Sequence, residues 1–354
     1  MTVSFVHEFK PLLEAVAQER VLYVPRQIDS YFSFERYAAE QERSVGFNPI
    51  RTLPSIKEFL FPYDERVAGI PGPPVVPPDV EPFAVFGLKA CDLRAIDILD
   101  RVFLERGFED PFYVARRGGL FTIASDCTAP GPGCFCSVVG GRPYPERGFD
   151  LNVAPVKDGF LVEPGSPQGR EFMARHAPLF GDAPEGLVKE RDRRRAEVQA
   201  QMEGMNAEWD LGGQSAREIV RRGAESEVFD EQARTCVECQ ACTRICPTCH
   251  CFYLYDLRRK DYFAKMKMWD SCMRMAYAEV AGGENPRRVL GDRLRHRLMH
   301  KFVYFFDRYG VEMCVGCGRC VEAEVGGVDL RKILAAIRQD LQGKGESCKK
   351  AVGR

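Results

Sequence analysis

The chain lacks a strong charge of either sign. Its 50 Lys and Arg residues nearly balance its 51 Asp and Glu residues, so the formal net charge of the 354 residues is −1 at pH 7. An overall electric field that would attract nucleic acid or an anionic membrane surface is therefore excluded. We expect no nucleic-acid partner.

Long apolar runs are missing too. No segment reaches the roughly 20 apolar residues that a membrane-spanning helix needs, and residues 1–20 contain acidic side chains instead of the basic start and apolar core of a secretory signal. We therefore expect a cytoplasmic protein without a membrane span. The 15 cysteines of the chain should then stay reduced, because disulfides are uncommon in the cytosol.

Motifs of common nucleotide-dependent and hydrolytic enzymes are also absent. The sequence has no phosphate-binding loop and no G-x-G-x-x-G turn after a predicted strand. Its 5 histidines are scattered, and no Ser/His/Asp set can be proposed from them. We find no flavin or nicotinamide site and assign no catalytic residue.

Two cysteine triplets dominate what is present. The first triplet (Cys236, Cys239, Cys242) is followed by Cys246 and Pro247, which completes the pattern C-x2-C-x2-C-x3-C-P. In two-cluster ferredoxins, each such run gives three thiolates to one [4Fe–4S] cluster and its fourth thiolate to the other cluster. We therefore expect two [4Fe–4S] clusters. The second triplet consists of Cys314, Cys317 and Cys320.

The second run departs from the pattern, because Glu324 stands where its fourth cysteine belongs. One cluster would take the second triplet and Cys246, and the other would take the first triplet and whatever residue fills position 324. Three arrangements remain open: the Glu324 carboxylate is the ligand, a nearby thiol replaces it, or that cluster is [3Fe–4S]. We favour Glu324 by its position, and an oxygen ligand should change the reduction potential of the cluster. The nearby thiols are Cys249, Cys251 and Cys272.

Glycines and competing metal-binding patterns bear on this interpretation. Gly316 and Gly318 are expected to let the backbone approach the cluster closely.

Structural zinc needs only four ligands, usually from two C-x2-C pairs, so the two triplets favour iron–sulfur clusters. Cys246 to His250 also matches C-x-x-C-H, the attachment signature of c-type haem, but Cys246 already belongs to the first run. A zinc-stabilised binding module is kept as an alternative.

A further group of cysteines precedes both triplets. Cys91 follows a predicted strand, and Cys127, Cys134 and Cys136 share one loop rich in Gly and Pro. These thiols either pack as small apolar side chains or hold a third iron–sulfur cluster. The pair Cys134 and Cys136 in a loop is hard to explain by packing, so we keep the third site as a hypothesis.

The pattern of apolar residues predicts an α+β fold. Short β-branched or aromatic runs predict buried strands at 21–25, 83–88 and 120–125. Residues 90–105 have the apolar spacing of a helix, with Asp92 near its amino end as a cap.

We divide the chain into three parts. Residues 1–183 should form an α/β domain that docks a partner, 184–230 a charged helical connector, and 231–354 a helix-rich, ferredoxin-like dicluster domain. An insertion at 252–313 separates the triplets and is expected to be mainly helical. The residues after Val328 have the spacing of one amphipathic helix.

Seven motifs occur together in the chain: CVECQACTRICPTCHCF (236–252), WDSC (269–272), AGGENPR (281–287), HKF (300–302), CVGCGRC (314–320), KACDLRAIDILDRVF (89–103) and DCTAPGPGCFC (126–136). In combination they resemble the 4Fe–4S dicluster subunits of soluble hydrogenases and anaerobic sulfite reductases. The similar proteins are the beta subunit of sulfhydrogenase-type NiFe hydrogenase and the corresponding dicluster subunit of anaerobic sulfite reductase. The resemblance covers most of the chain.

The resemblance implies a non-catalytic electron-transfer subunit. Its implied partners are a flavin subunit that binds NAD(P)H and a hydrogenase or sulfite-reductase-type catalytic subunit. Members of the family end the second run with cysteine-proline, whereas this chain has Glu324 and Val325, so the type and potential of one cluster stay open. In a remaining alternative, the amino-terminal domain itself reduces a small substrate.

Overall fold

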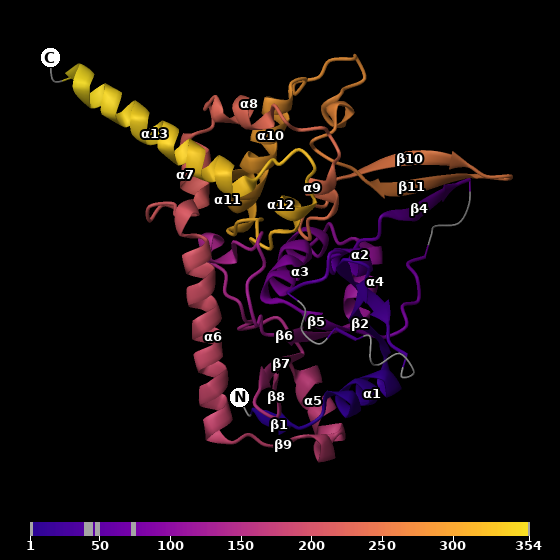
Figure 1. Ribbon diagram of the computed structural model, residues 1–354. Coiled ribbons are helices and arrows are strands. Elements are labelled where there is room, and N and C mark those ends of the chain that lie inside the picture. The colour runs from indigo at the N-terminus through magenta and orange to yellow at the C-terminus, as the bar shows by residue number, and fades with distance from the viewer. Residues whose placement is uncertain (1–2, 39–44, 47–49, 72–75, 353–354) are drawn as a thin grey trace. The chain divides into compact units, whose positions relative to one another are not determined.

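The computed structural model describes residues 3–38, 45–46, 50–71 and 76–352 (Figure 1). The chain divides into two compact units, which we call the α/β unit and the cysteine unit. Each is built from three separate segments, so neither unit is one continuous stretch of sequence. The α/β unit comprises Met1–Phe61, Val76–Gly131 and Gly141–Gly204, and the cysteine unit comprises Pro62–Val75, Pro132–Gly140 and Met205–Arg354.

The α/β unit is built on an eight-stranded mixed sheet with the strand order β3-β2-β5-β6-β7-β8-β1-β9. Strands β2, β5, β6 and β7 are parallel neighbours, and the other pairs are antiparallel. Every residue of β5 and β6 is buried, as expected for central parallel strands. The three predicted strands are confirmed as parts of β2, β5 and β6. The strands are β1 Ser4–Val6, β2 Val21–Ile28, β3 Tyr31–Arg36, β5 Phe83–Leu88, β6 Leu120–Ser125, β7 Leu151–Val156, β8 Gly159–Pro164 and β9 Gly181–Asp182.

Helices of the α/β unit pack their apolar sides against this sheet. Leu12 and Val16 of α1 and Phe172 of α5 share a core with Phe86 and Phe121 of the sheet, and burying such side chains supplies most of the folding free energy. The helices are α1 Phe9–Glu19, α2 Lys57–Leu60, α3 Ala90–Phe103, α4 Pro111–Gly119, α5 Pro167–Arg175, η3 Ala177–Leu179 and α6 Glu185–Met205.

Two of these helices agree with sequence expectations. Helix α3 covers the predicted helix, and the Asp92 carboxylate accepts a hydrogen bond from the Lys89 backbone N–H at 3.1 Å, which caps the amino end. Helix α6 opens the charged segment and buries three residues, Arg191, Val198 and Met202. Figure 1 shows it as one long, unbroken helix.

The cysteine unit is mainly helical around one apolar core. Phe135, Phe229, Leu294, Phe302 and Ile333 come from distant parts of the sequence and meet there. The amphipathic helix predicted after Val328 is confirmed as α13. The elements are β4 Asp64–Ile70, η2 Cys136–Val139, η4 Ala207–Trp209, α7 Ala216–Arg222, α8 Val228–Ala233, α9 Ala241–Arg244, β10 Phe252–Arg258, β11 Phe263–Trp269, η5 Met275–Ala278, α10 Leu290–Leu298, the π-helix η6 Met299–Tyr304, α11 Phe305–Tyr309, α12 Arg319–Ala323 and α13 Leu330–Val352.

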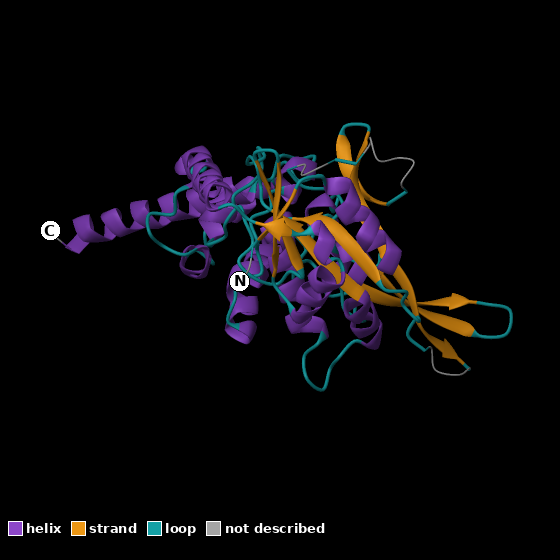
Figure 2. Cartoon of the chain, turned by 90° about the horizontal axis from the view of Figure 1, so that it is seen from below, coloured by secondary structure: helices purple, strands orange, loops and turns teal. Residues whose placement is uncertain are grey.

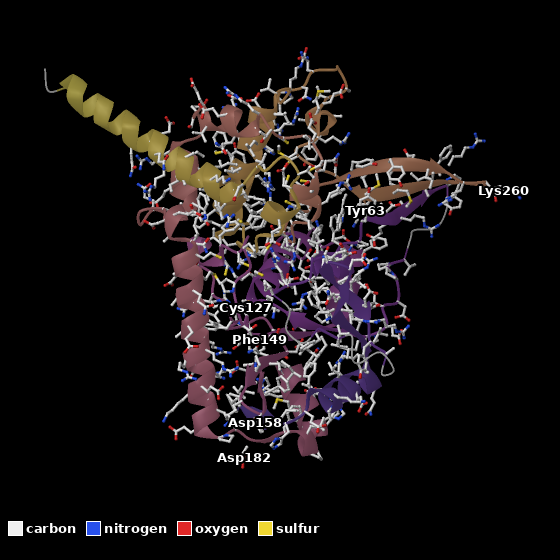
Figure 3. The ribbon with its side chains drawn as sticks, in the orientation of Figure 1. Tyr63, Cys127, Phe149, Asp158, Asp182 and Lys260 are labelled. Atoms are coloured by element: carbon white, nitrogen blue, oxygen red, sulfur yellow. The ribbon has the colours of Figure 1, made fainter. Side chains whose placement is uncertain are left out.

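The first part of the insertion corrects our expectation, because residues 252–269 form a β-hairpin instead of a helix. Strands β10 and β11 pair in antiparallel register from Phe252 opposite Trp269 to Arg258 opposite Phe263. Strand β4 pairs with β11 and completes a three-stranded sheet, seen among the orange strands of Figure 2. Lys260, labelled in Figure 3, lies in the turn of the hairpin.

The physical reason for this error is a contact between residues distant in sequence. The segment is rich in Lys, Met, Leu and Arg, which have good helix propensity. Strand β4, nearly 200 residues earlier, supplies hydrogen-bond partners to β11 that no local pattern reveals. The helical part of the expectation is met later in the insertion by α10, the π-helix and α11.

No helix among the described residues combines the length and the apolar character that crossing a lipid bilayer requires.

Candidate metal centre

Both triplets adopt the same backbone path. Glu238 and Gln240 in the first triplet have positive φ angles of 53° and 63°, and Gly316 and Gly318 in the second have 64° and 77°. These residues stand at matching positions, two and four residues after the first cysteine of each triplet. A short helix follows each turn, α9 after Gln240 and α12 after Gly318, and it contains the third cysteine. The triplets are therefore structural repeats, as their shared spacing predicts.

Glycine is required only in the second repeat, where another loop passes close to the backbone. A Cβ atom on Gly316 would lie 2.5 Å from the Cα of Cys136, and one on Gly318 would lie 2.2 Å from the carbonyl oxygen of Gly133. The Phe135 N–H donates to the Gly316 carbonyl at 2.9 Å. The close approach found at these glycines is therefore to the loop at 132–140.

Four thiols lie together around the second triplet. We call Cys246, Cys314, Cys317 and Cys320 the four-thiol set. Burial raises the pKa of Cys314 to about 11 and that of Cys320 to about 12, and the negative charges of Cys246 and Cys317 also raise both pKa values. Such mutual influence requires proximity. The four thiols of the expected interlocked set therefore influence one another as neighbouring groups do, and their binding of one cluster stays a prediction.

Glu324 lies with the first triplet. We call Cys236, Cys239, Cys242 and Glu324 the Glu324 set. Burial is the largest cause that raises the pKa of Cys236 and that of Cys242, and the charges of Cys239 and Glu324 raise both further. The Glu324 carboxylate therefore influences the pKa values of two cysteines of this set, and its role as the fourth ligand stays a prediction.

One oxygen of the Glu324 carboxylate accepts a hydrogen bond and the other does not. Its side chain is 9% exposed, and Oε2 accepts a hydrogen bond from the Val328 N–H at 2.7 Å. Oε1 is buried and has no hydrogen-bond partner among the described residues. A buried unpaired carboxylate oxygen is costly, and a metal ion would satisfy it. Three thiolates and one free carboxylate oxygen fit an iron–sulfur cluster as donor set.

The other thiols considered for this vacancy hydrogen-bond to cysteines. The Cys249 thiol donates to Cys246 and lowers the pKa of Cys246 well below its ordinary value. The Cys272 thiol is the largest cause that lowers the pKa of Cys251, to about 6. These contacts favour Glu324 over the three thiols as the fourth donor to the first triplet.

Comparison with known proteins agrees with this geometry. Residues 235–328 match a family model described as a 4Fe–4S dicluster domain. The chain is also 32% identical over 322 residues to the beta subunit of sulfhydrogenase 2 from Pyrococcus furiosus, covering 90% of this chain and 93% of the relative. The chain belongs to this family of 4Fe–4S dicluster subunits.

The family assignment makes the module an iron–sulfur module and disfavours the zinc alternative. Structural zinc usually takes its four ligands from two C-x2-C pairs, whereas the thiolates of a [4Fe–4S] cluster bind separate iron atoms.

The amino-terminal cysteines of the dicluster subunit fall into both units. Cys91, in the first turn of α3, and Cys127, after β6, belong to the α/β unit. Burial lowers the pKa of Lys89, and the charges of Cys127 and Cys91 oppose this effect. Cys134 and Cys136 belong to the cysteine unit, where the Cys134 thiol donates to the Cys317 carbonyl at 3.9 Å. Neither unit by itself contains all four thiols.

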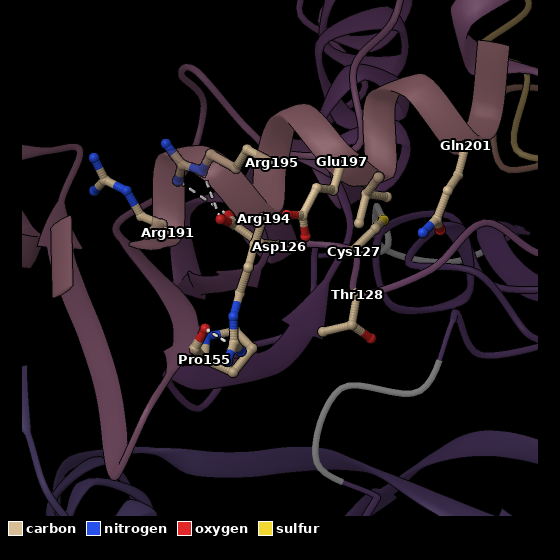
Figure 4. Close-up of a pocket in the computed structure, with 10 residues that line it drawn as sticks. Asp126, Cys127, Thr128, Pro155, Arg191, Arg194, Arg195, Glu197 and Gln201 are labelled. Carbon is tan, nitrogen blue, oxygen red and sulfur yellow. Dashed lines mark hydrogen bonds and ion pairs between the residues drawn. The ribbon is translucent and has the colours of Figure 1, made fainter. Parts of the chain in front are cut away.

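A cavity of about 250 Å³ opens beside Cys127 in the α/β unit, at the carboxyl end of β6 (Figure 4). Arginines of α6 line the cavity and form ion pairs with acidic side chains. Arg195 Nε lies 2.6 Å from Asp126 Oδ2, and Arg191 Nη1 lies 3.3 Å from Glu163 Oε2. Ligands of open α/β sheets bind at this edge of parallel strands. The cavity is therefore where the substrate of the enzymatic alternative would bind.

Two cations of the basic segment 286–301 are buried among the cysteines. Lys301 and Arg297 are each 2% exposed. The Lys301 ammonium donates to the Cys246 sulfur at 3.3 Å, and Arg297 Nη2 donates to the Cys242 carbonyl at 3.3 Å. From its sequence this basic segment is either a solvated helix face or a face for an acidic partner or for the negatively charged clusters. The burial of Arg297 and Lys301 favours the clusters.

The glycine requirement of the second repeat gives a first prediction. Gly318→Ala should lower the free energy of unfolding by about 1–3 kcal/mol, because a Cβ at this positive φ angle adds strain and collides with the loop at 132–140. Gln240→Ala, at the matching position of the first repeat, should change it by less than about 1 kcal/mol. Thermal unfolding of anaerobically purified protein measures both. Equal melting temperatures for the two variants would contradict the account.

The free oxygen of Glu324 gives a second prediction. Glu324→Ala and Glu324→Gln should both lose about one iron per chain and alter the EPR spectrum of one cluster. Glu324→Gln is the matched control, since its amide oxygen can still accept from the Val328 N–H. Glu324→Cys should retain the iron and shift the potential of that cluster. Unchanged iron and EPR in the Ala and Gln variants would show that Glu324 is no ligand.

Proposed function

We propose that the protein is an electron-transfer subunit of a cytoplasmic complex. It passes electrons between a flavin subunit that binds NAD(P)H and a hydrogenase or sulfite-reductase-type catalytic subunit. The observation that carries the proposal is the gathering of two complementary ligand sets in one unit of a chain that resembles a sulfhydrogenase beta subunit throughout its length. We propose no catalytic residue for the chain itself.

In this proposal each repeat gives its fourth ligand to the cluster of the other repeat. Cys246 follows the first triplet in sequence but contributes to the cluster of the second, and Glu324 follows the second triplet but contributes to the cluster of the first. When bound, each cluster accepts and releases one electron. In this proposal the two cysteine turns already have defined backbone conformations, so we expect little rearrangement of protein groups during electron transfer. The ligands are Cys236, Cys239, Cys242 and Glu324 for one cluster and Cys246, Cys314, Cys317 and Cys320 for the other.

The proposed relay predicts that loss of a cluster ligand slows electron transfer through the whole complex and leaves the activity of the flavin subunit unchanged. In the reconstituted complex, Cys246→Ser should lower the rate of electron transfer from NAD(P)H to the catalytic subunit. The decrease should be at least about tenfold, because the variant removes a thiolate from the four-thiol set. The flavin subunit should still reduce a soluble dye with NAD(P)H at its ordinary rate. Coupled activity that persists after both ligand sets are disrupted would contradict the relay.

A third cluster held by Cys91, Cys127, Cys134 and Cys136 remains part of the proposal as a hypothesis. It predicts about 12 iron atoms per chain, falling to about 8 in Cys91→Ala and equally in Cys134→Ala. One variant from each unit is needed, because the four thiols are divided between the units. About 8 iron atoms in the unchanged protein and in both variants would make these cysteines structural.

The cavity beside Cys127 supports a second candidate, in which the α/β unit reduces a small substrate with electrons from the clusters. Under anaerobic conditions, a substrate that oxidises the isolated, reduced chain would support this interpretation. Its discriminating variant is Gln201→Trp, which would fill the cavity from α6 and should slow only the substrate-dependent oxidation. Candidate substrates that leave the chain reduced would favour the relay.

A further inference from the structure

The fixed charges around the two ligand sets differ. Lys301 is a charged side chain buried in the core of the cysteine unit, and its ammonium lies 3.3 Å from the sulfur of Cys246. An ordinary lysine is protonated at neutral pH, and thiolates beside it favour the ammonium further. The four-thiol set therefore has a permanent positive charge against one of its ligands.

The local helix geometry fixes this charge in place. Lys301 lies in the π-helix Met299–Tyr304, between α10 and α11, and its neighbours Phe302 and Val303 are buried with it. A π-helical turn inside an α-helix is rare and commonly marks a functional position. The backbone N–H of Met313, just before the second triplet, donates to the Lys301 carbonyl at 2.8 Å. The lysine is thus tied to the second repeat by its backbone as well as by its side chain.

The other nearby charges do not cancel this difference. Arg297 influences Cys242 of one set and Cys320 of the other, so its charge is shared between the two sets. The negative charge of Glu324 raises the pKa values of Cys236 and Cys242, but this carboxylate stands in place of a fourth thiolate, so each set has four anionic donors. The difference between the sets is therefore the Lys301 cation beside Cys246. Since reduction adds one negative charge to a cluster, a neighbouring cation favours it.

We propose that the charge of Lys301 gives the cluster of the four-thiol set a higher reduction potential than the cluster of the Glu324 set. The first electron that enters the subunit would then reside on the four-thiol cluster. The inference rests on the proposed iron–sulfur function and goes beyond it by ordering the two clusters. No bond forms or breaks in the step: one electron from the flavin subunit, or from dithionite in the test, reduces the four-thiol cluster first. Lys301 acts as a positioning residue through its charge on Cys246.

The test is an EPR-monitored potentiometric titration of the full chain, with Lys301→Met and Lys301→Arg compared with the unchanged protein. Lys301→Met should lower the midpoint potential of one cluster by at least 59 mV, which is a tenfold change in its ratio of reduced to oxidised form for one electron. Lys301→Arg keeps the charge and should restore most of the original potential. The Glu324→Gln variant identifies which signal belongs to the other cluster, whose potential should move much less.

Several outcomes would overturn the inference. An unchanged potential in a Lys301→Met protein with full iron content would do so, and so would an equal shift in the Met and Arg variants or a shift confined to the Glu324 cluster. If Lys301→Met loses iron, Lys301→Gln, which retains a polar group against the sulfur, takes its place in the same titration. Loss of iron in both neutral variants would make Lys301 a structural residue. If Lys301→Met shifts the midpoint potential as predicted but the complex does not transfer electrons from NAD(P)H, the proposed relay function is wrong and the inference about Lys301 stands.

Discussion

The cysteine unit depends on burying many ionisable sulfur ligands together in a small apolar core. Thiolates and carboxylates that leave water need counter-charges, hydrogen bonds or metal. Lys301 and Arg297 supply two buried cations, and the Val328 N–H holds one oxygen of Glu324. Buried polar atoms that these contacts leave without a partner, such as Oε1 of Glu324, are consistent with metal binding. The core around Phe302 and Ile333 is the scaffold that keeps these groups in place.

The unit is also assembled from segments far apart in sequence. The loop at 132–140 lies against the second repeat, which explains the glycines there, and β4 completes the sheet of the hairpin. The ligand turns therefore depend on segments from the amino-terminal half of the chain in order to fold. A piece containing only the two triplets would lack β4, the loop and Phe135 of the core.

Sequence reasoning found the features whose signals are local. The cysteine spacing predicted two cluster-binding runs, and apolar runs predicted β5, β6 and α3. It also predicted Glu324 as the fourth ligand of the first triplet; the charge of Glu324 raises the pKa values of Cys236 and Cys242, and its ligation of a cluster stays a prediction. The hairpin, which needs β4, was missed. The basic segment at 286–301 was one candidate for a face toward the clusters, but its sequence could not show that Lys301 contacts Cys246, 55 residues away. Long-range pairing of this kind leaves no periodic pattern.

The most direct test of the account is a count of metal and electrons in the full chain. Anaerobically purified protein would be analysed for iron, zinc and acid-labile sulfide, and then titrated with dithionite while EPR follows the reduced clusters. The account predicts at least about 7–8 iron atoms per chain, matching sulfide, and at least about two electrons taken up in separate steps. About four iron atoms with a single electron, or zinc in place of iron, would contradict it.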